Sequence, residues 1–340
     1  MGDAPTFTGR MNRTAVLPLV IAGALSVGCA VFEPKPPPPP ATPMNQYVAG
    51  YRAYQRGDAE TAKTDLNAAV AANPELRMAR TLLGEIYRKQ RDYVSAAAQY
   101  KALADSDPYT VDNHYYLGVS YQFMQRYRAS AAAYLRGLQI SPNDFKTTMA
   151  LGTVYLALGE TGEAVNYLRR ATELEPNSAT AWSNYGVALD AKGSLADAEK
   201  AYRNAMERDP SSGAIVQNLA NNLMAQKKTG ESIYFWQQLI KVEPTPFRRV
   251  RLAEAFVQAQ DFTKADREID ELLREEPAYP AAYNARATSK LRQFELSGFG
   301  NDRLRVEAVA ALQKSLALNA NQPETEKLLR EYQSASAIGK

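Results

Sequence analysis

The stretch FKTTMALGTVYLALGETGEAVNYLRRATELEPNS, residues 145–178, decides the fold, because its pattern recurs along most of the chain. It carries a glycine at its eighth position and a proline near its end. The same glycine recurs every 34 residues, at Gly50, Gly84, Gly118, Gly152 and Gly186. Proline has the same period, at Pro74, Pro108, Pro142, Pro176, Pro210 and Pro244, and then at Pro277 after 33 residues. A fixed period of this length indicates a repeat architecture.

Each period reads as a pair of helices. Apolar residues spaced at i, i+3, i+4 and i+7 give each half of the period one apolar stripe. The glycine, and a small residue such as Ala164 in the second half, allow the two helices to approach closely. The proline ends the second helix and begins the next unit. Since one hairpin cannot cover its own apolar stripe, neighbouring hairpins must stack into a solenoid.

These positions resemble the tetratricopeptide repeat family over residues 43–320. The resemblance implies an all-α, right-handed superhelical solenoid of about eight helix-turn-helix repeats, which begin near residues 43, 77, 111, 145, 179, 213, 246 and 280. The eighth repeat departs from the pattern, because Arg286 and Lys290 stand at apolar positions and about nine extra residues enlarge its turn. Residues 321–340 are expected to form a capping helix and a tail, with Leu328, Leu329 and Tyr332 on the apolar side of the helix.

Composition argues against most kinds of catalytic or metal site. The 340 residues include one cysteine, Cys29, and one histidine, His114, so a zinc site, an iron–sulfur cluster, an internal disulfide and a Cys–His nucleophile pair are all unsupported. The sequence has no glycine-rich phosphate loop and no stretch outside the repeats long enough for a catalytic domain. We therefore expect no enzyme activity, no cofactor, no metal and no small-molecule substrate. The formal net charge of +3, from 40 basic and 37 acidic residues, gives no reason to expect nucleic-acid binding.

Residues 1–28 have the features of a signal peptide. Arg10 and Arg13 form a basic region, and the apolar stretch from Ala15 to Leu25 has the length that signal peptides use. Either Met1 or Met11 is the start of this segment. A plain secretory signal and an uncleaved membrane anchor are the alternatives.

The dipeptide Gly28-Cys29 resembles the end of the lipobox of bacterial lipoproteins, although Ser26 stands where that family usually has leucine. The resemblance implies that Cys29 becomes the acylated first residue, for example with palmitate, and that the protein is anchored in the cell envelope. We expect the outer membrane, facing the periplasm, with the inner membrane as the alternative. Residues 29–42 contain the run Pro36–Pro40, which favours a stiff polyproline II tether. A proline-rich ligand for a partner domain is the other interpretation.

In the tetratricopeptide repeat family, the first helix of each pair lines a groove that holds partner peptides. The N-terminal part of that groove is expected to be aromatic and apolar, with Tyr47, Tyr51, Tyr54, Tyr115, Gln122 and Met149. Units five and six supply amide side chains that can bond the backbone of an extended peptide: Asn184, Gln217, Asn218 and Asn221. Packing between repeats and simple solvation are equally good interpretations of any single residue in this set.

Two further features are candidates for contact. The densest basic cluster contains Arg248, Arg249 and Arg251, with Lys227 and Lys228 nearby in sequence, and is either a solvated helix end or an anion site. The enlarged turn of the eighth unit carries Phe294, Leu296 and Phe299, which either form a contact surface or pack onto the last repeat.

A lipobox followed by repeats and little else resembles the lipoproteins that assist pilus and secretin assembly, including TadD-type lipoproteins of the Tad/Flp pilus and type IV pilotins. This resemblance implies a pilotin or chaperone whose groove binds a pilus or secretin subunit while the lipid holds the protein at the membrane. A structural adaptor for cell-wall, polysaccharide or division machinery is the alternative, because the fold fixes the groove and not its occupant.

Overall fold

The computed structural model describes residues 42–333. The expected signal peptide 1–28, the lipidation site Cys29, the tether up to residue 41 and the tail 334–340 lie outside the described residues. Within residues 42–333, none of the helices is long and apolar enough to cross a membrane.

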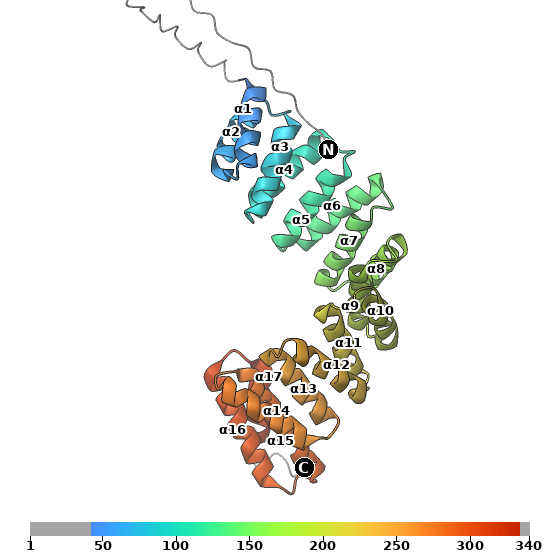
Figure 1. Ribbon diagram of the computed structural model, residues 1–340, viewed down its shortest axis with the longest axis vertical. Coiled ribbons are helices and arrows are strands. Elements are labelled where there is room, and N and C mark those ends of the chain that lie inside the picture. Colours follow the sequence, from blue (N-terminus) through green and yellow to red (C-terminus); the bar gives the residue numbers. More distant parts are fainter. Residues whose placement is uncertain (1–41, 334–340) are drawn as a thin grey trace, which may run out of the picture. The chain divides into compact units, whose positions relative to one another are not determined.

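Eight helical hairpins and one final helix make up the described chain (Figure 1). The first helices of the hairpins are α1 (Pro43–Gln55), α3 (Arg77–Lys89), α5 (Val111–Phe123), α7 (Phe145–Leu158), α9 (Ala179–Ala191), α11 (Gly213–Ala225), α13 (Pro246–Gln258) and α15 (Pro280–Leu296). The second helices are α2 (Ala59–Ala72), α4 (Tyr93–Ser106), α6 (Tyr127–Ile140), α8 (Thr161–Leu174), α10 (Leu195–Arg208), α12 (Thr229–Val242), α14 (Phe262–Glu275) and α16 (Asp302–Leu318). The final helix is α17 (Pro323–Gln333).

Local sequence explains where these helices begin. Several helices start after a Thr, Asp or Ser whose side-chain oxygen accepts a hydrogen bond from the backbone N–H three residues later. Asp58 accepts from Thr61 at 3.1 Å in this way, and Asp144 accepts from Thr147 at 2.8 Å. The prolines of the 34-residue period stand in the short connections that follow second helices, where the chain can leave the helix without losing a needed amide donor.

Within a hairpin, the periodic glycine lies against a large side chain of the second helix. A Cβ atom placed on Gly186 would lie 2.6 Å from Cε1 of Tyr202, and one placed on Gly118 would meet the ring of Tyr134 in the same way. Tyr134 and Tyr202 are almost fully buried. The glycine therefore allows an aromatic ring to fill the space between the two helices.

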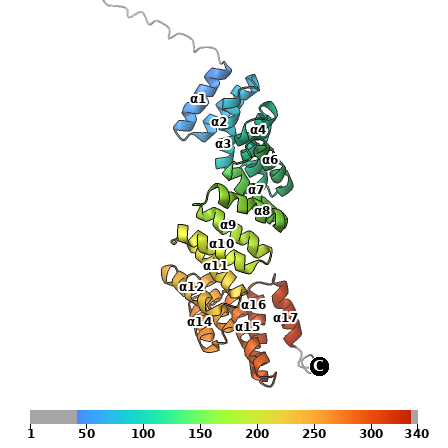
Figure 2. The same ribbon diagram turned by 90° about the vertical axis from the view of Figure 1, so that its right-hand side faces the viewer.

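Successive hairpins stack side by side, so that each second helix packs against the next first helix (Figure 2). Neighbouring hairpins share buried apolar clusters throughout residues 42–333. The predicted fold class, an all-α solenoid of helix-turn-helix repeats, is confirmed.

The eighth hairpin is longer than the others, because both α15 and α16 have 17 residues. Helix α17 covers its end. Leu328, Leu329 and Tyr332 pack against the last apolar cluster, and Arg305 donates a hydrogen bond to the Tyr332 carbonyl at 2.8 Å. The polar outer side of α17 then faces solvent, as expected of a capping helix.

Candidate functional site

The first helices present one shared surface, which we call the first-helix face. The closest pairs of non-consecutive helices are all between first helices, for example α1 with α3 and α9 with α11. Positions 2, 5, 9 and 12 of a helix fall on one side, because an α-helix has 3.6 residues per turn. The first-helix face consists of these positions and the residues beside them.

The N-terminal end of this face carries exposed apolar side chains from two neighbouring helices. Met44 and Tyr51 of α1 are 47% and 42% exposed, and Met78 of α3 is 50% exposed. Tyr47 is half-buried and its ring stacks on Tyr51, with centroids 6.2 Å apart and planes 28° apart. These side chains offer an apolar surface to a partner. Met78 was not among the residues predicted from the sequence, although it occupies the second position of the second unit.

Tyr54 has a different place from Tyr47 and Tyr51. Its hydroxyl donates to Glu85 Oε1 at 2.7 Å and accepts from Lys89 Nζ at 2.5 Å, so it joins the first repeat to the second. The Lys89 ammonium also lies 5.1 Å from the centre of the Tyr54 ring. The hydrogen bond from Lys89 lowers the pKa of Glu85 below its usual value. Tyr54 therefore has a structural partner in the next repeat, which reduces its freedom to bind another protein.

The candidates of the third and fourth repeats are largely engaged in packing. Tyr115 is half-buried, with its ring edge-on to Tyr116 at a centroid distance of 5.1 Å. Gln122 accepts a hydrogen bond from the buried Tyr134 hydroxyl at 3.0 Å. Met149 packs against the apolar cluster centred on the fourth and fifth repeats. These side chains shape the first-helix face more than they offer free binding groups.

Free amide groups lie further along the face, on α9 and α11. Asn184, Gln217 and Asn221 are partly exposed, and their side-chain amides make no hydrogen bond to any residue of the described chain. Asn218 donates to the Ser183 hydroxyl at 3.4 Å, which is a long and weak hydrogen bond. Each free amide can both donate to a carbonyl and accept from an N–H, which is what the backbone of an extended peptide requires.

A buried polar network supports this amide region from below. Asn222 is 2% exposed and donates to Asp190 at 2.5 Å, and the Tyr202 hydroxyl donates to the same carboxylate at 2.8 Å. Burial raises the pKa of Asp190, while the two hydrogen bonds act in the opposite direction. Asn222 also donates to the Leu195 carbonyl at 3.0 Å. The network joins α9, α10 and α11, so it fixes the helices that carry the free amides.

His114 has a structural partner. Its Nε2 lies 3.0 Å from the Pro108 carbonyl, six residues earlier, and the side chain is buried. Trp182 makes the equivalent contact to the Pro176 carbonyl at 2.9 Å, and Tyr283 makes it to Pro277 at 3.0 Å. A polar ring at this position therefore closes the connection between repeats. Among residues 42–333, no group of three or more His, Cys, Asp or Glu side chains is placed to hold a metal ion.

The basic cluster of the seventh repeat is not an open anion site, because its three arginines are paired with carboxylates. Arg249 is buried and contacts three carboxylates of α14, namely Glu268 at 3.5 Å, Glu271 at 3.4 Å and Glu275 at 3.0 Å. Arg251 pairs with Glu254 at 2.8 Å, and Arg248 pairs with the Glu243 carboxylate at 3.0 Å. Lys228 belongs to another set of contacts and pairs with Glu199 at 2.6 Å. The sequence could not reveal this pairing, because the glutamates of α14 are about 20 or more residues away.

In the enlarged turn of the eighth repeat, some apolar side chains are buried and others are exposed. Phe294 is 2% exposed and meets Phe299 edge-on at a centroid distance of 5.3 Å. Leu296 and Phe299 remain half exposed. Part of each interpretation is therefore correct, since one aromatic ring packs and the other two side chains face solvent.

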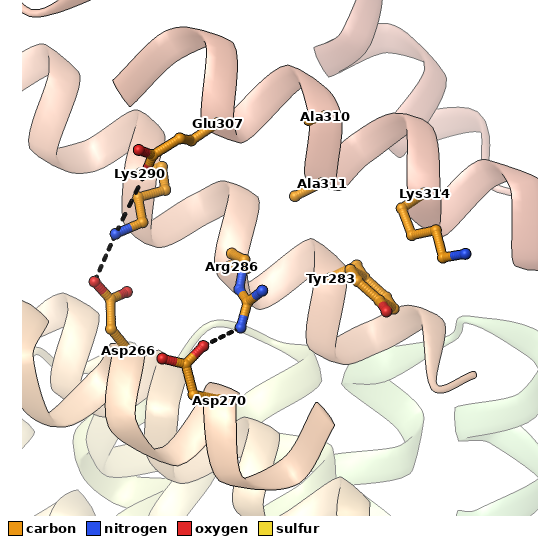
Figure 3. Close-up of a pocket in the computed structure, with 9 residues that line it drawn as sticks. All are labelled: Asp266, Asp270, Tyr283, Arg286, Lys290, Glu307, Ala310, Ala311 and Lys314. Carbon is orange, nitrogen blue, oxygen red and sulfur yellow. Dashed lines mark hydrogen bonds and ion pairs between the residues drawn. The ribbon is translucent and has the colours of Figure 1, made fainter. Parts of the chain in front are cut away.

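Arg286 and Lys290, the two charged residues at apolar positions of the eighth repeat, line a groove of about 450 Å³ between α14 and α16. Figure 3 shows Lys290 between two carboxylates, with its Nζ 2.7 Å from Asp266 and 3.8 Å from Glu307. Arg286 pairs with Asp270 in the same groove. These ion pairs explain the departure from the repeat pattern, because α14 provides the compensating charges.

Comparison with known proteins identifies the repeat type. Residues 47–110 and 149–213 match the profile of the tetratricopeptide repeat family. No curated protein is significantly similar in sequence to the chain.

Three solved structures illustrate the likeness in fold. A tetratricopeptide repeat protein from Parabacteroides merdae ATCC 43184 matches with a TM-score of 0.52 and 17% identity, over 86% of this chain and 99% of that chain. Pseudomonas aeruginosa PilF matches with a TM-score of 0.50 and 17% identity, over 61% of this chain and 94% of its own. A chain of the APC/C heterotetramer Cut9-Hcn1 matches with a TM-score of 0.53 and 12% identity, over 85% of this chain and 55% of that chain. Identities this low show the fold alone, which is a solenoid of the tetratricopeptide repeat type.

Proposed function

We propose that this tetratricopeptide repeat protein is a non-catalytic lipoprotein of the bacterial envelope, and that its first-helix face binds an extended segment of a partner protein. The observation that carries this proposal is the combination of two surfaces on one face. Exposed apolar side chains of α1 and α3 lie at one end, and free amides of α9 and α11 lie further along. Apolar side chains of a partner segment suit the first surface, and its backbone suits the second.

The two surfaces have different energetic roles. Burying Tyr51 and Met78 against apolar groups supplies binding free energy at about 25 cal/mol per Å² of apolar surface removed from water. The amides of Asn184, Gln217 and Asn221 contribute less net free energy, since each exchanges water for backbone groups at about 0.5 to 1.5 kcal/mol per hydrogen bond. They favour an extended backbone in the segment, whatever its sequence.

We further propose that the partner is a pilus or secretin subunit, and that acyl chains on Cys29 hold the complex at the outer membrane. Support for this part comes from the sequence plan, in which a lipobox-like Gly28-Cys29 and a proline-rich tether precede the repeats. Each methylene of an acyl chain that enters the bilayer contributes about 0.8 kcal/mol to membrane binding. A single chain gives only weak and reversible binding, so stable anchoring needs more than one chain. PilF of Pseudomonas aeruginosa shares the fold, which fits the proposal and adds nothing to it about the partner.

Site-specific photocrosslinking tests the binding face. A benzoylphenylalanine introduced at Tyr51 or at Asn221 lies on the first-helix face, whereas one introduced at Tyr234 lies on α12, where the side chain is 56% exposed. Crosslinking in intact envelopes should give the same partner from Tyr51 and Asn221 and no such product from Tyr234. Equal products from all three positions, or no product from Tyr51 and Asn221, would contradict the assignment of the first-helix face as the binding surface. A cell-wall, polysaccharide or division protein as the product would keep the face and replace the pilus assignment.

Fractionation tests the anchor. The Cys29→Ser variant should move from the membrane fraction to the soluble periplasmic fraction, because it has no thiol to acylate. Labelling with an alkyne fatty acid is the companion measurement and should mark the wild type alone. Membrane retention of an unlabelled wild type would contradict the lipoprotein assignment and point to the uncleaved apolar segment.

A further inference from the structure

A second groove lies between α4 and α6 and is also lined by α5. It has a volume of about 670 Å³. Its floor is made by Ala129, Ala132 and Ala133, and its walls include Leu117, Tyr121 and Tyr109. Tyr109 is 81% exposed, so an aromatic ring stands free at the mouth of an apolar groove.

The groove exists because α6 has two adjacent alanines where other second helices have larger side chains. Ala132 and Ala133 follow the buried small residue Ser130 by two and three positions. The equivalent pairs are Thr64-Asp65, Ala98-Gln99, Asn166-Tyr167, Lys200-Ala201, Tyr234-Phe235 and Arg267-Glu268 in α2, α4, α8, α10, α12 and α14. Only α16 repeats the double alanine, at Ala310 and Ala311, and there the structure has the charged groove between α14 and α16 (Figure 3).

The α4–α6 groove is separate from the first-helix face. Leu117 and Tyr121 of α5 line it, whereas Tyr115 and Gln122 belong to the first-helix face. At 3.6 residues per turn, these two pairs fall on roughly opposite sides of α5. A ligand in the groove would therefore leave the first-helix face free.

The rim of the groove carries a cation without an acidic partner. Arg136 donates to the Gln139 side chain at 3.1 Å and pairs with no carboxylate in residues 42–333. The other charges of the rim compensate each other, since Lys101 pairs with Asp105 at 2.6 Å. An apolar groove with one uncompensated guanidinium at its edge fits an apolar side chain that is followed or preceded by a carboxylate.

We propose that the α4–α6 groove is a second binding site, which takes an apolar segment of a partner protein with an adjacent Asp or Glu. Apolar side chains of the segment would fill the space above the alanines, between Tyr109 and Tyr121. The acidic residue would pair with Arg136. The site therefore allows the protein to hold two partner segments at once, one on each side of the solenoid.

The α14–α16 groove provides an internal control, because it has the same backbone origin and opposite chemistry. Arg286 and Lys290 replace Leu117 and Tyr121 there, and Glu307 replaces Ala129. Its cations are paired with carboxylates of its own walls. Ala310 and Ala311 line this groove too, but an apolar acidic segment would have to displace the ion pairs of Arg286 and Lys290 to enter it, so it should prefer the α4–α6 groove.

Peptide display on the full-length protein tests the proposal. A phage library of random dodecapeptides is selected on the wild type and counter-selected on the Ala132→Trp variant, in which an indole fills the groove. Ala132 is exposed, so this variant should fold normally. The recovered peptides should contain two or more apolar residues beside an Asp or Glu.

A fluorescein-labelled copy of the dominant peptide then measures affinity. Arg136→Glu should weaken its binding by about tenfold or more, as should Tyr121→Ala. Ala310→Trp and Tyr51→Ala should leave the affinity unchanged, because they alter the α14–α16 groove and the first-helix face. Recovery of no Ala132-dependent peptide, an affinity insensitive to Arg136→Glu, or equal losses with Ala310→Trp or Tyr51→Ala would each overturn the proposal. None of these results bears on the crosslinking test of the first-helix face.

Discussion

The hydroxyl of Tyr202 on α10 donates a 2.8 Å hydrogen bond to the carboxylate of Asp190 on α9, in a network where Asn222 is the other donor. This hydrogen bond links the two helices of the fifth repeat, and the hydrogen bond from Asn222 links them to the sixth repeat. No Lys or Arg of the described residues pairs with this carboxylate. Its charge is therefore stabilised by two neutral donors alone, beside the amides that we assign to partner binding.

This arrangement predicts a pH-dependent contribution of Asp190 to stability. Burial raises the pKa of Asp190 in the folded state above its ordinary value of 3.8, so the buried carboxylate lowers the free energy of unfolding once it is charged. This loss of stability is absent below the pKa that Asp190 has in the unfolded chain. It develops as the pH rises through the higher pKa that Asp190 has in the folded protein. In urea unfolding followed by circular dichroism, the free energy of unfolding of Asp190→Asn relative to wild type should increase as the pH rises through this window. A difference that stays constant with pH would contradict the assignment.

Tyr202→Phe provides a second arm of the same experiment. Its removed hydroxyl is one of the groups that lower the pKa of Asp190, so the transition in this variant should move to higher pH. An unchanged transition would mean that the hydroxyl does not act on the carboxylate.

The contact of Gly186 with Tyr202 predicts a second effect in the same hairpin. A methyl group at position 186 would lie 2.6 Å from the Tyr202 ring, which is itself held by the core and by Asp190. Gly186→Ala should therefore lower the free energy of unfolding by about 1 to 3 kcal/mol, as overpacking of a core does. The matched control is Gly162→Ala on α8, where an added Cβ meets nothing within 4 Å and should be neutral or stabilising by up to about 1 kcal/mol. Equal effects of the two substitutions would refute the close-approach role of the glycine.

The repeat architecture could be predicted from the sequence because the same local pattern recurs many times along the chain. A glycine opposite a bulky residue, such as Gly118 and Tyr134, and a proline after seven of the eight second helices are local signals at nearly constant offsets. Each repeat contacts mainly its neighbours, so the packing between two repeats predicts the packing along the whole solenoid. Fold class therefore followed from spacing alone.

Side-chain roles were harder to predict, because they depend on partners in neighbouring helices. Tyr51 and Tyr54 are equivalent in the sequence pattern, yet Tyr54 meets Glu85 of the next repeat while Tyr51 stays exposed. The α4–α6 groove is hard to predict for another reason. Its signal, the adjacent Ala132 and Ala133, lies in a second helix, whereas the repeat pattern points to the first helices as the binding surface.

The turns between the two helices of a hairpin predict a third effect. Gln125 has a φ of 57° at the turn between α5 and α6, where the next repeat has Gly159 with a φ of 76°. A side chain in this left-handed conformation costs about 1 to 2 kcal/mol, of which the greater chain entropy of unfolded glycine offsets about 0.5 to 1 kcal/mol. Gln125→Gly should raise the free energy of unfolding by up to about 1 kcal/mol, and Gly159→Gln should lower it by a similar amount. Thermal unfolding of both variants measures the two shifts, and shifts of the same sign would contradict the conformational explanation.

Arg249 gives the fourth prediction, which concerns stability between the helices of the seventh repeat. Its guanidinium is buried and lies 3.0 to 3.5 Å from three carboxylates of α14, so its removal leaves three like charges together without a cation. Arg249→Met keeps most of the apolar stem of the side chain and should lower the free energy of unfolding by about 1 to 2 kcal/mol, because the guanidinium is buried while solvent screens the partly exposed Glu271 and Glu275. Arg251→Met is the matched control two residues away. Arg251 is more exposed and pairs with Glu254 alone, so its substitution should cost less than about 1 kcal/mol. Urea denaturation of the two variants measures both values, and a loss for Arg249→Met no larger than that for Arg251→Met would show that the glutamates of α14 are satisfied by solvent instead.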